Sequence, residues 1–281
     1  MVYNFNMLKN ITNNENKFAF VTGATGGLGN SFCRKLAEQK YNLLLTGTNS
    51  TKLENFKKQL LESHSDINII TFACDLSIIE DREKLLKFID DKQIQINFFV
   101  CNAGYITEGS IENCYADTLI KCIRVNCEGN IHLTKEILDR RNPKELMQII
   151  CVTSLAANYP MPYMAIYSAT KALLKSFMQS LSFEYKDKNV NVLIVEPGAI
   201  ETSEKMIEAI KAQGVKGKLS VVQADIIASN SIKKSLKNKK QYIPGFFNKM
   251  TLFISNLAPT RLRTNAVGKM WKKSQQKRNI K

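Results

Sequence analysis

Tyr167 and Lys171 are the first residues whose types and spacing could do chemistry. They are four positions apart, so they share one face of the helix that the spacing predicts over residues 165–186. A lysine ammonium beside a phenol stabilises the phenolate, which makes such a hydroxyl a usable acid near neutral pH. Taken alone, the pair could equally be a packing tyrosine beside a solvated lysine, because a lysine-rich chain with nine tyrosines produces this spacing by chance.

A glycine-rich turn is the second candidate. The segment TGATGGLG, residues 22–29, follows the apolar run 17–22 and precedes the helical spacing of residues 31–40. Glycines at positions 23, 27 and 29 would allow a tight turn and a close approach of backbone to a pyrophosphate at the helix N-terminus. The spacing is G-x-x-x-G-x-G and not G-x-G-x-x-G, and by itself it could be only a strand-to-helix turn.

Three more short polar or turn-forming segments follow apolar runs. Ser154 comes thirteen residues before Tyr167, and Asn102-Ala103-Gly104 and Pro197-Gly198 each follow a run of their own. Any one of them could be only a cap or a turn. In open parallel α/β sheets, however, ligands bind at the carboxyl ends of the strands. We therefore expect these segments, the glycine-rich turn and the tyrosine–lysine pair to meet at one edge of a sheet.

Short apolar runs and helical segments alternate from residue 17 to about residue 200. The predicted strands are residues 17–22, 42–46, 68–73, 96–100, 146–152 and 190–195. The predicted helices are residues 31–40, 52–62, 85–89, 115–140 and 165–186. This alternation predicts an α/β fold, a Rossmann-type doubly wound parallel sheet in a single domain with a C-terminal helical extension.

The chain divides into a flexible polar leader (1–16), a Rossmann domain (17–245) and a basic amphipathic C-terminal extension (246–281). Within the domain, residues 203–225 interrupt the alternation and contain Gly214. We expect them to form a lid over the site, although an ordinary surface helix and loop is the alternative.

Composition limits the classes of protein. With 281 residues, 44% hydrophobic and 23% charged, the chain is typical of a soluble globular protein and not of a disordered, collagen-like or coiled-coil one. We see no secretory signal and no apolar run long enough to span a bilayer. The seven cysteines include no CxxC pair, so we expect buried thiols in a cytoplasmic protein. With only two histidines, a His-based metal site or a Ser-His-Asp triad is not favoured.

The net charge of +15 is concentrated at one end. Residues 231–281 hold fourteen Lys and Arg and no acid, which leaves 26 basic residues against 25 acidic ones in residues 1–230. Apolar residues at helical spacing mark residues 246–258.

The C-terminal extension has two interpretations. One is a helix that docks its apolar face on the domain or on a second subunit and then frays into a solvated tail. The other is peripheral contact with the inner membrane surface, which would suit a lipid-like ketone. Nucleic acid is disfavoured because no recognised reading module accompanies the charge.

Together these motifs resemble the short-chain dehydrogenase/reductase family. The resemblance rests on TGATGGLG (22–29), Asp75-Leu76, CNAG (101–104), Asn126, Ser154, YSATK (167–171) and Pro197-Gly198 followed by Thr202. They occur in the family's order and spacing over residues 17–202. The segment 242–249 is similar to the bacterial DltE-like branch, close to ketoacyl and hydroxysteroid reductases.

The resemblance implies catalytic roles for four residues. Tyr167 would donate and accept the proton, and Lys171 would favour its ionised form and hold the nicotinamide ribose. Ser154 would hydrogen-bond the substrate carbonyl. Asn126 would anchor a water that links Lys171 to solvent, although it could also be a helix-interior residue that satisfies backbone groups. Cys101 replaces the family's usual Asn, which we expect to alter local turn bonding and not catalysis.

The resemblance also implies cofactor contacts, with Asp75 at the adenine edge unless it merely caps a helix. The expected cofactor-binding residues are Gly23, Thr25, Gly26, Leu28, Gly29, Thr48, Asp75, Leu76, Asn102, Ala103, Gly104, Tyr167, Lys171, Pro197, Gly198, Ile200 and Thr202.

The end of the second predicted strand bears on the choice between NADP and NAD. A carboxylate there would bind the ribose diol and repel a 2′-phosphate. The first acid after this strand is Glu54. Thr48 stands where many NADP-using relatives have Arg, but Thr25, Thr48, Asn49 and Lys52 could donate to a phosphate. We therefore expect NADP, with NAD less favoured.

The expected function is NADP-dependent hydride transfer between nicotinamide and a small-molecule carbonyl or secondary alcohol. A non-catalytic dinucleotide-binding regulatory scaffold is the alternative, but a pure binder would not need all four catalytic-type residues. The resemblance implies a homodimer or homotetramer through helices 115–140 and 165–186. The substrate pocket is expected from residues 155–165 and 203–225, whose chemistry names no particular substrate.

Overall fold

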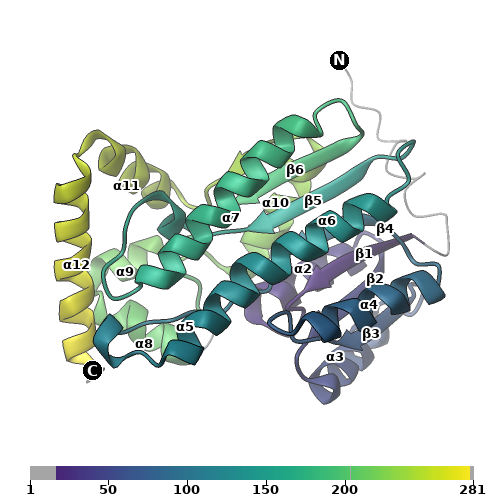
Figure 1. Cartoon of the computed structure of the whole chain (residues 1–281), viewed down its shortest axis with the longest axis horizontal. Coiled ribbons are helices and arrows are strands. Elements are labelled where there is room, and N and C mark those ends of the chain that lie inside the picture. The colour runs from purple at the N-terminus through teal and green to yellow at the C-terminus, as the bar shows by residue number, and fades with distance from the viewer. Residues whose placement is uncertain (1–16, 203, 279–281) are drawn as a thin grey trace.

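The computed structural model describes residues 17–202 and 204–278. The expected leader (1–16), Ser203 of the expected lid and residues 279–281 lie outside the described residues. In the described part of the chain, seven parallel strands form one sheet in the order β3-β2-β1-β4-β5-β6-β7 (Figure 1). The strands are β1 (Lys17–Thr22), β2 (Asn42–Gly47), β3 (Ile69–Ala73), β4 (Gln95–Cys101), β5 (Met147–Val152), β6 (Val190–Val195) and β7 (Gln241–Tyr242).

Helices cover both faces of this sheet. They are α2 (Gly27–Ala37), α3 (Ser50–Ser63), α4 (Ile79–Asp91), α5 (Ala116–Ile123), α6 (Asn130–Arg140), α7 (Ala165–Glu184), α8 (Glu204–Ala212), α9 (Val215–Ser220), α10 (Ala224–Leu236), α11 (Phe246–Leu257) and α12 (Thr260–Lys277). One core cluster joins the sheet to α2, α3 and α10, and a second joins it to α4, α6 and α7. The result is a three-layer Rossmann-type fold, as the sequence predicts.

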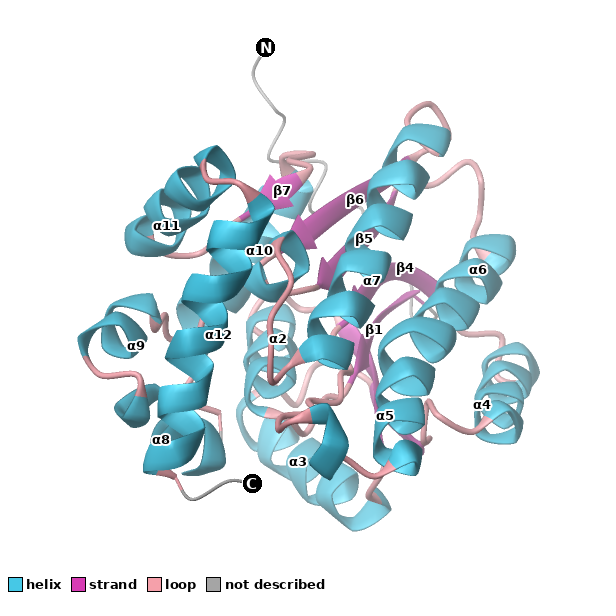
Figure 2. Cartoon of the chain, turned by 60° about the vertical axis from the view of Figure 1, so that its left-hand side comes forward, coloured by secondary structure: helices cyan, strands magenta, loops and turns pink. Residues whose placement is uncertain are grey.

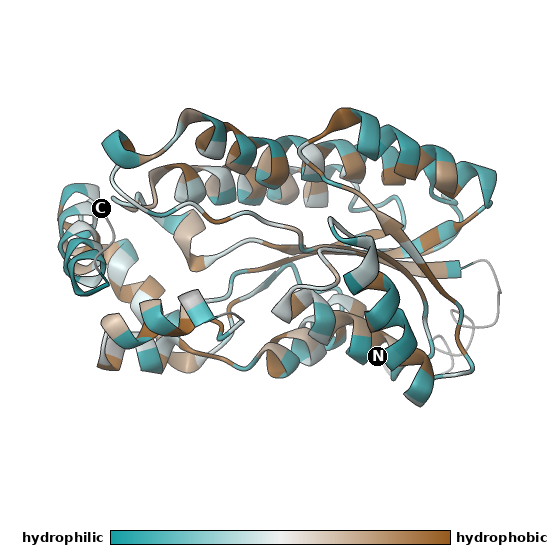
Figure 3. Cartoon of the chain, turned by 90° about the horizontal axis from the view of Figure 1, so that it is seen from below, coloured by the Kyte–Doolittle hydropathy of each residue, from teal (hydrophilic) through white to brown (hydrophobic). Residues whose placement is uncertain are grey.

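The apolar runs form strands because both of their faces are buried. In β1, Ala19 and Val21 belong to one core cluster, and Phe18 and Phe20 belong to the other. The strands accordingly appear as apolar ribbons between helices whose outer faces are polar (Figure 3). The strand order reverses between β1 and β4, and this switch point is where open α/β sheets bind their ligands.

The helix α10 and the strand β7 were not predicted. The helix α10 packs Ile227, Ala228 and Ile232 into the core, but Ser231 and Ser235 lie buried on the same helix and obscure its apolar spacing. Their hydroxyls donate to Ile227 O and to Gln148 Oε1, both at 2.7 Å, so the buried polar groups are satisfied. The other element is the two-residue strand β7, which pairs with β6.

The predicted single helix over residues 115–140 is in fact three elements. The helices α5 and α6 are separated by a π-helical segment, η2 (Arg124–Gly129). Such segments often lie at functional sites, and this one contains Asn126. The two 3₁₀ segments that matter below are η1 (Ile111–Asn113) and η3 (Leu155–Asn158).

The expectation of a frayed, solvated tail was wrong, because the chain continues as α12 to Lys277. Its residues 267, 271, 274 and 275 share one helical face, and Trp271 packs with Met161 and Met164. The helices α8, α9, α11 and α12 gather at one end of the molecule (Figures 1 and 2). No helix in the described residues is both long and apolar enough to cross a bilayer.

Candidate active site

A cavity of about 440 Å³ runs along the carboxyl ends of the central strands. Its walls include every expected cofactor-binding residue, together with Ser154, and Asn126 is the one expected site residue that they lack. Residues that are as far as 179 positions apart in the sequence thus meet in one place, as the strand-end argument predicts. The lid segment also reaches the cavity, because Met206 of α8 is part of its wall.

The turn between β1 and α2 is shaped for close approach by a ligand. Gly23 has a φ of +64°, a conformation that side chains other than glycine rarely adopt. A Cβ at Gly29 would lie 2.8 Å from Asn102 Nδ2 and closer still to Gly23 O, and one at Gly27 would lie 2.5 Å from Thr202 Cγ2. The helix α2 has Gly26 as its N-cap, without a side-chain cap bond. Its first N–H groups are therefore free for an anion, which fits the pyrophosphate of a dinucleotide.

The segment after β4 holds this turn in place. Asn102 Nδ2 donates to Thr22 O at 3.0 Å and to Gly23 O at 3.3 Å, and Ala103 N donates to Thr22 Oγ1 at 3.0 Å. Cys101 is buried in β4, and its Sγ lies 3.1 Å from Asn130 Oδ1. The cysteine therefore joins β4 to α6, and Asn102 forms the bonds to the glycine turn.

Lys171 is fixed at the bottom of the cavity beside Tyr167. Its side chain is 3% exposed, and Nζ donates to Val152 O at 2.9 Å. Nζ lies 5.9 Å from the centroid of the Tyr167 ring. No carboxylate forms an ion pair with this ammonium in the described residues. Because an ammonium has three N–H donors, two of them are left for groups inside the cavity.

Ser154 lies two residues after the end of β5 and is the N-cap of η3, which was the alternative role considered for it. Its Oγ accepts a hydrogen bond from Ala156 N at 3.1 Å and so caps η3. An oxygen that accepts in this way still has its own proton to donate. The cap therefore fixes the hydroxyl and leaves its donor for a ligand in the cavity.

Asn126 is buried beneath the cavity and not on its wall. Its Oδ1 accepts from Tyr105 N at 2.7 Å, and its Nδ2 donates to Tyr105 O at 2.9 Å and to Thr170 Oγ1 at 3.0 Å. The interpretation of an interior asparagine that satisfies backbone groups describes these bonds well. It ties the segment after β4 to α7, between the glycine turn and the tyrosine–lysine pair.

Asp75 lines the far end of the cavity and is already bonded. Its Oδ1 accepts from Ser77 N at 2.9 Å and from Ser77 Oγ at 2.6 Å, and its Oδ2 accepts from Lys121 Nζ at 2.9 Å. Burial raises the pKa of Asp75, but the bonds from Ser77 and Lys121 outweigh it and hold that pKa below the ordinary value. The carboxylate is thus charged and compensated, and it organises the turn before α4.

The end of β2 carries no carboxylate that faces the cavity. Glu54 accepts a hydrogen bond from Thr71 Oγ1, and Asn49 Oδ1 accepts from Lys52 N at 2.8 Å as the N-cap of α3. Asn49 and Glu54 are therefore engaged elsewhere. Thr25 and Thr48 remain on the wall, and Asp75 is the one acid among the described lining residues.

Comparison with known proteins agrees with this geometry. The family model for short chain dehydrogenase matches residues 17–213. The chain belongs to the short-chain dehydrogenase family. It is 27% identical over 259 residues to dehydrogenase/reductase SDR family member 7B of Rattus norvegicus, with 87% of this chain and 78% of that protein covered. It is 30% identical over 194 residues to a very-long-chain 3-oxoacyl-CoA reductase of Neurospora crassa, with 68% of this chain but only 58% of that protein covered.

Solved structures show the same fold. A 7beta-hydroxysteroid dehydrogenase superposes with a TM-score of 0.78 at 19% identity, covering 90% of this chain and 96% of that one. A short-chain dehydrogenase from Sphingobium yanoikuyae, solved in complex with NADPH, superposes with a TM-score of 0.70 at 19% identity, covering 86% and 94%. As a short-chain dehydrogenase, the protein is an oxidoreductase that uses a nicotinamide dinucleotide on a small-molecule carbonyl or alcohol. The DltE-like branch stays a prediction.

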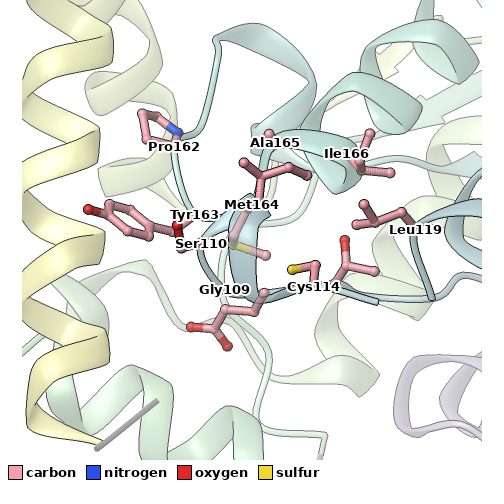
Figure 4. A pocket seen from close by; sticks show the side chains of 12 residues that line it. Gly109, Ser110, Cys114, Leu119, Pro162, Tyr163, Met164, Ala165 and Ile166 are labelled. Carbon is pink, nitrogen blue, oxygen red and sulfur yellow. The ribbon is translucent and has the colours of Figure 1, made fainter. Parts of the chain in front are cut away.

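The C-terminal helix packs beside the tyrosine, a contact that the sequence analysis did not predict. Trp271 of this short-chain dehydrogenase is buried with Ala156, Met161 and Met164, and Tyr167 packs against the same cluster. A second hollow of about 310 Å³ lies beside it, between residues 107–119 and 162–166. Figure 4 shows Pro162 and Tyr163 directed toward α12 at one side of that hollow.

An ion pair holds the end of α12 over this region. Arg278 forms a bidentate pair with Glu108, and both side chains are nearly buried. The expected substrate pocket, residues 155–165 and 203–225, stays a prediction, and the hollow lies partly outside it, at residues 107–119. The signal for α12 was present in the sequence, since residues 267, 271, 274 and 278 follow helical spacing.

Proposed function

We propose that the protein is an NADP-dependent reductase in which Tyr167 is the acid/base for a carbonyl or secondary alcohol. One observation carries the proposal. A single cavity joins the glycine turn and the uncapped start of α2 to Ser154, Tyr167 and Lys171. A dinucleotide held along the strand ends would thus reach the polar groups that can move a proton.

Each of these residues has a distinct task in the proposed mechanism. When bound, the nicotinamide would supply or accept the hydride. The Tyr167 hydroxyl would give its proton to the substrate oxygen, and the Ser154 hydroxyl, fixed by Ala156 N, would donate to the same oxygen. Lys171, held on Val152 O, would stabilise the phenolate left behind. Asn126 would keep the segment after β4 in register with α7.

The preference for NADP rests on the end of β2. Glu54 bonds to Thr71, and the first turn of α3 contains no acid. A 2′-phosphate would therefore meet Thr25, Thr48 and the positive end of a helix without a repelling carboxylate. Two solved neighbours are described with NADPH, and they support this choice at the level of the shared fold.

The substrate side suits a carbonyl with an apolar substituent. Met161, Met164 and Trp271 form an apolar cluster beside Tyr167, and one similar protein is named for very-long-chain 3-oxoacyl-CoA. We propose a lipid-like carbonyl or alcohol as the substrate class, with α8 and α9 as its lid. The cytoplasm stays the proposed location.

A homodimer or homotetramer is also part of the proposal. The helices expected to pair two subunits expose apolar side chains, namely Ile120, Ile123, Leu173 and Phe183. Such side chains would be buried if α5 and α7 met their copies in a second subunit.

The test is NADPH oxidation with a panel of medium- and long-chain ketones, for the native chain and for Tyr167→Phe. We expect turnover by the native protein and a loss of about 10²–10⁴-fold in kcat for the variant, with NADPH affinity unchanged. Ser154→Ala should lose activity to a smaller extent. Equal turnover by Tyr167→Phe would refute the assigned role. NADPH binding without turnover of any ketone by the native protein would favour the regulatory scaffold.

A further inference from the structure

The helix α11 faces the wrong way for a helix that packs on its own domain. The polar Asn248 is 1% exposed and buried with Leu252, whereas Phe246 is 79% exposed, Phe253 63% and Leu257 73%. Amphipathic helices of globular proteins bury their apolar side and expose their polar one. The interpretation that α11 docks its apolar face on the domain was therefore wrong, and that face lies outward.

Asn248 fixes this orientation. Its Nδ2 donates to Pro244 O at 2.8 Å and to Ser220 O at 3.0 Å. Close packing adds to these bonds, since a Cβ at Gly198 would lie 2.7 Å from Asn248 Nδ2 and one at Gly245 would lie 3.1 Å from the same atom. Turning the apolar side inward would break both bonds and bury other polar groups without partners. The outward face is thus built into the fold.

We define the C-terminal apolar face as the exposed side chains of α11 and the start of α12: Phe246, Met250, Phe253, Ile254, Leu257 and Leu262. The adjoining helix α9, which Asn248 contacts through Ser220, exposes Val215 and Leu219 as well. Contiguous exposed apolar surface of this kind marks a site of interaction with a protein or a membrane.

The charges around the face decide between these partners. Residues 231–281 contain no acid. On the two helices that carry the face, Lys249 of α11 and Arg261, Lys269, Lys272 and Lys273 of α12 are exposed, and none of them forms an ion pair in the described residues. In a two-fold dimer the same patch meets itself, so like charges would oppose one another across the contact. An anionic surface instead would pair with all of them.

We propose that the C-terminal apolar face docks on an anionic lipid bilayer. Its aromatic and aliphatic side chains would enter the boundary between headgroups and acyl chains, and the bases would contact the headgroups. Through Asn248 the docked helix contacts Gly198, which lines the cofactor cavity. The proposal concerns binding and does not depend on the proposed reaction.

The experiment is vesicle flotation of the full chain with phosphatidylcholine alone and with phosphatidylcholine containing phosphatidylglycerol. Four chains are compared: native, Phe253→Ser/Ile254→Ser, Lys272→Glu/Lys273→Glu, and the matched control Leu146→Ser. Leu146 is 40% exposed and precedes β5, outside the face. Far-UV circular dichroism and urea unfolding check the folding of each chain.

We expect the native chain to bind the anionic vesicles and to bind neutral ones at least about tenfold more weakly. The serine and glutamate double variants should each lose at least about tenfold in binding to anionic vesicles, and Leu146→Ser should bind like the native chain. The proposal is overturned if the native chain stays with no vesicle, or if the serine double variant binds as well as the control. It is also overturned if light scattering shows that the serine double variant has half the mass of the native protein in solution. In that case a second copy of the chain would cover the face.

Discussion

Two regions of the molecule are built in different ways: the glycine turn, which is the proposed cofactor end, and the cluster around Trp271, which is the proposed substrate end. The cofactor end is formed mainly by main chain. Gly23, Gly27 and Gly29 leave room that a single carbon atom would fill, and Asn102 bonds to main-chain oxygens. At the substrate end, side chains of separate segments meet, with Trp271 of α12 packed beside Met161 and Met164 of the segment before α7. A substitution at the first region therefore displaces main chain, whereas one at the second removes side-chain packing.

The largest effect should come from the substrate end. Trp271→Ala removes a buried aromatic side chain, and we expect the free energy of unfolding to fall by about 3–5 kcal/mol. Where the variant remains folded, KM for the ketone should rise while NADPH affinity stays the same. Urea unfolding and steady-state kinetics measure both. Leu262→Ala, exposed on the same helix, should change the free energy of unfolding by less than about 0.5 kcal/mol. Equal losses from the two substitutions would contradict the packing role of Trp271.

The cofactor end is broken by one methyl group. Gly29→Ala places a carbon 2.8 Å from Asn102 Nδ2 and even closer to Gly23 O, so the turn must open. We expect NADPH affinity to fall by about 100-fold, equivalent to about 2.7 kcal/mol. Gly26→Ala is the matched comparison, because its added carbon would lie 3.3 Å from Gly23 O, and its loss should be much smaller. Fluorescence titration measures both affinities, and an unchanged NADPH affinity in Gly29→Ala would mean that the turn does not contact the cofactor.

The sequence predicted most of the cofactor end, because its signals are local. The bounds of β1 and β6 match the predicted runs, and the glycine turn follows β1 directly. The substrate end depends on contacts between distant segments. Trp271 lies in a basic stretch of the sequence, and the residues that bury it, Met161 and Met164, are more than 100 positions away. Asn126 was placed correctly on a helix, but its bonds to Tyr105 depend on a π-helical segment that spacing does not reveal.

A substitution at the end of β2 should have a smaller effect, on the preference between NADPH and NADH and not on dinucleotide binding as such. Thr48→Asp puts a carboxylate at the end of β2, where it would repel a 2′-phosphate and bind a ribose diol. We expect the ratio of NADPH to NADH affinity to fall by about tenfold, as one unfavourable charge contact of about 1.4 kcal/mol would give. The ratio from paired titrations checks this, and an unchanged ratio would mean that Thr48 is not near the phosphate.

The smallest effect concerns Asp75. Its pKa lies below the ordinary value, so its contribution to stability is present above that value and is lost as the pH falls through the pKa in the folded state. We expect Asp75→Asn to lower the free energy of unfolding by no more than about 1 kcal/mol at pH 7, because the pair with Lys121 is partly exposed. The difference should shrink below the ordinary aspartate value of 3.8. A difference that grows at low pH would contradict the assigned bonds.

A paired titration of the native protein with NADPH and NADH, followed by nicotinamide fluorescence, tests most directly that this cavity is a working NADP site. The account predicts saturable NADPH binding at least about tenfold tighter than NADH binding, since the walls near β2 lack a repelling carboxylate. A preference for NADH would contradict the interpretation of Thr48 and leave the family intact. Binding of neither nucleotide would contradict the central claim.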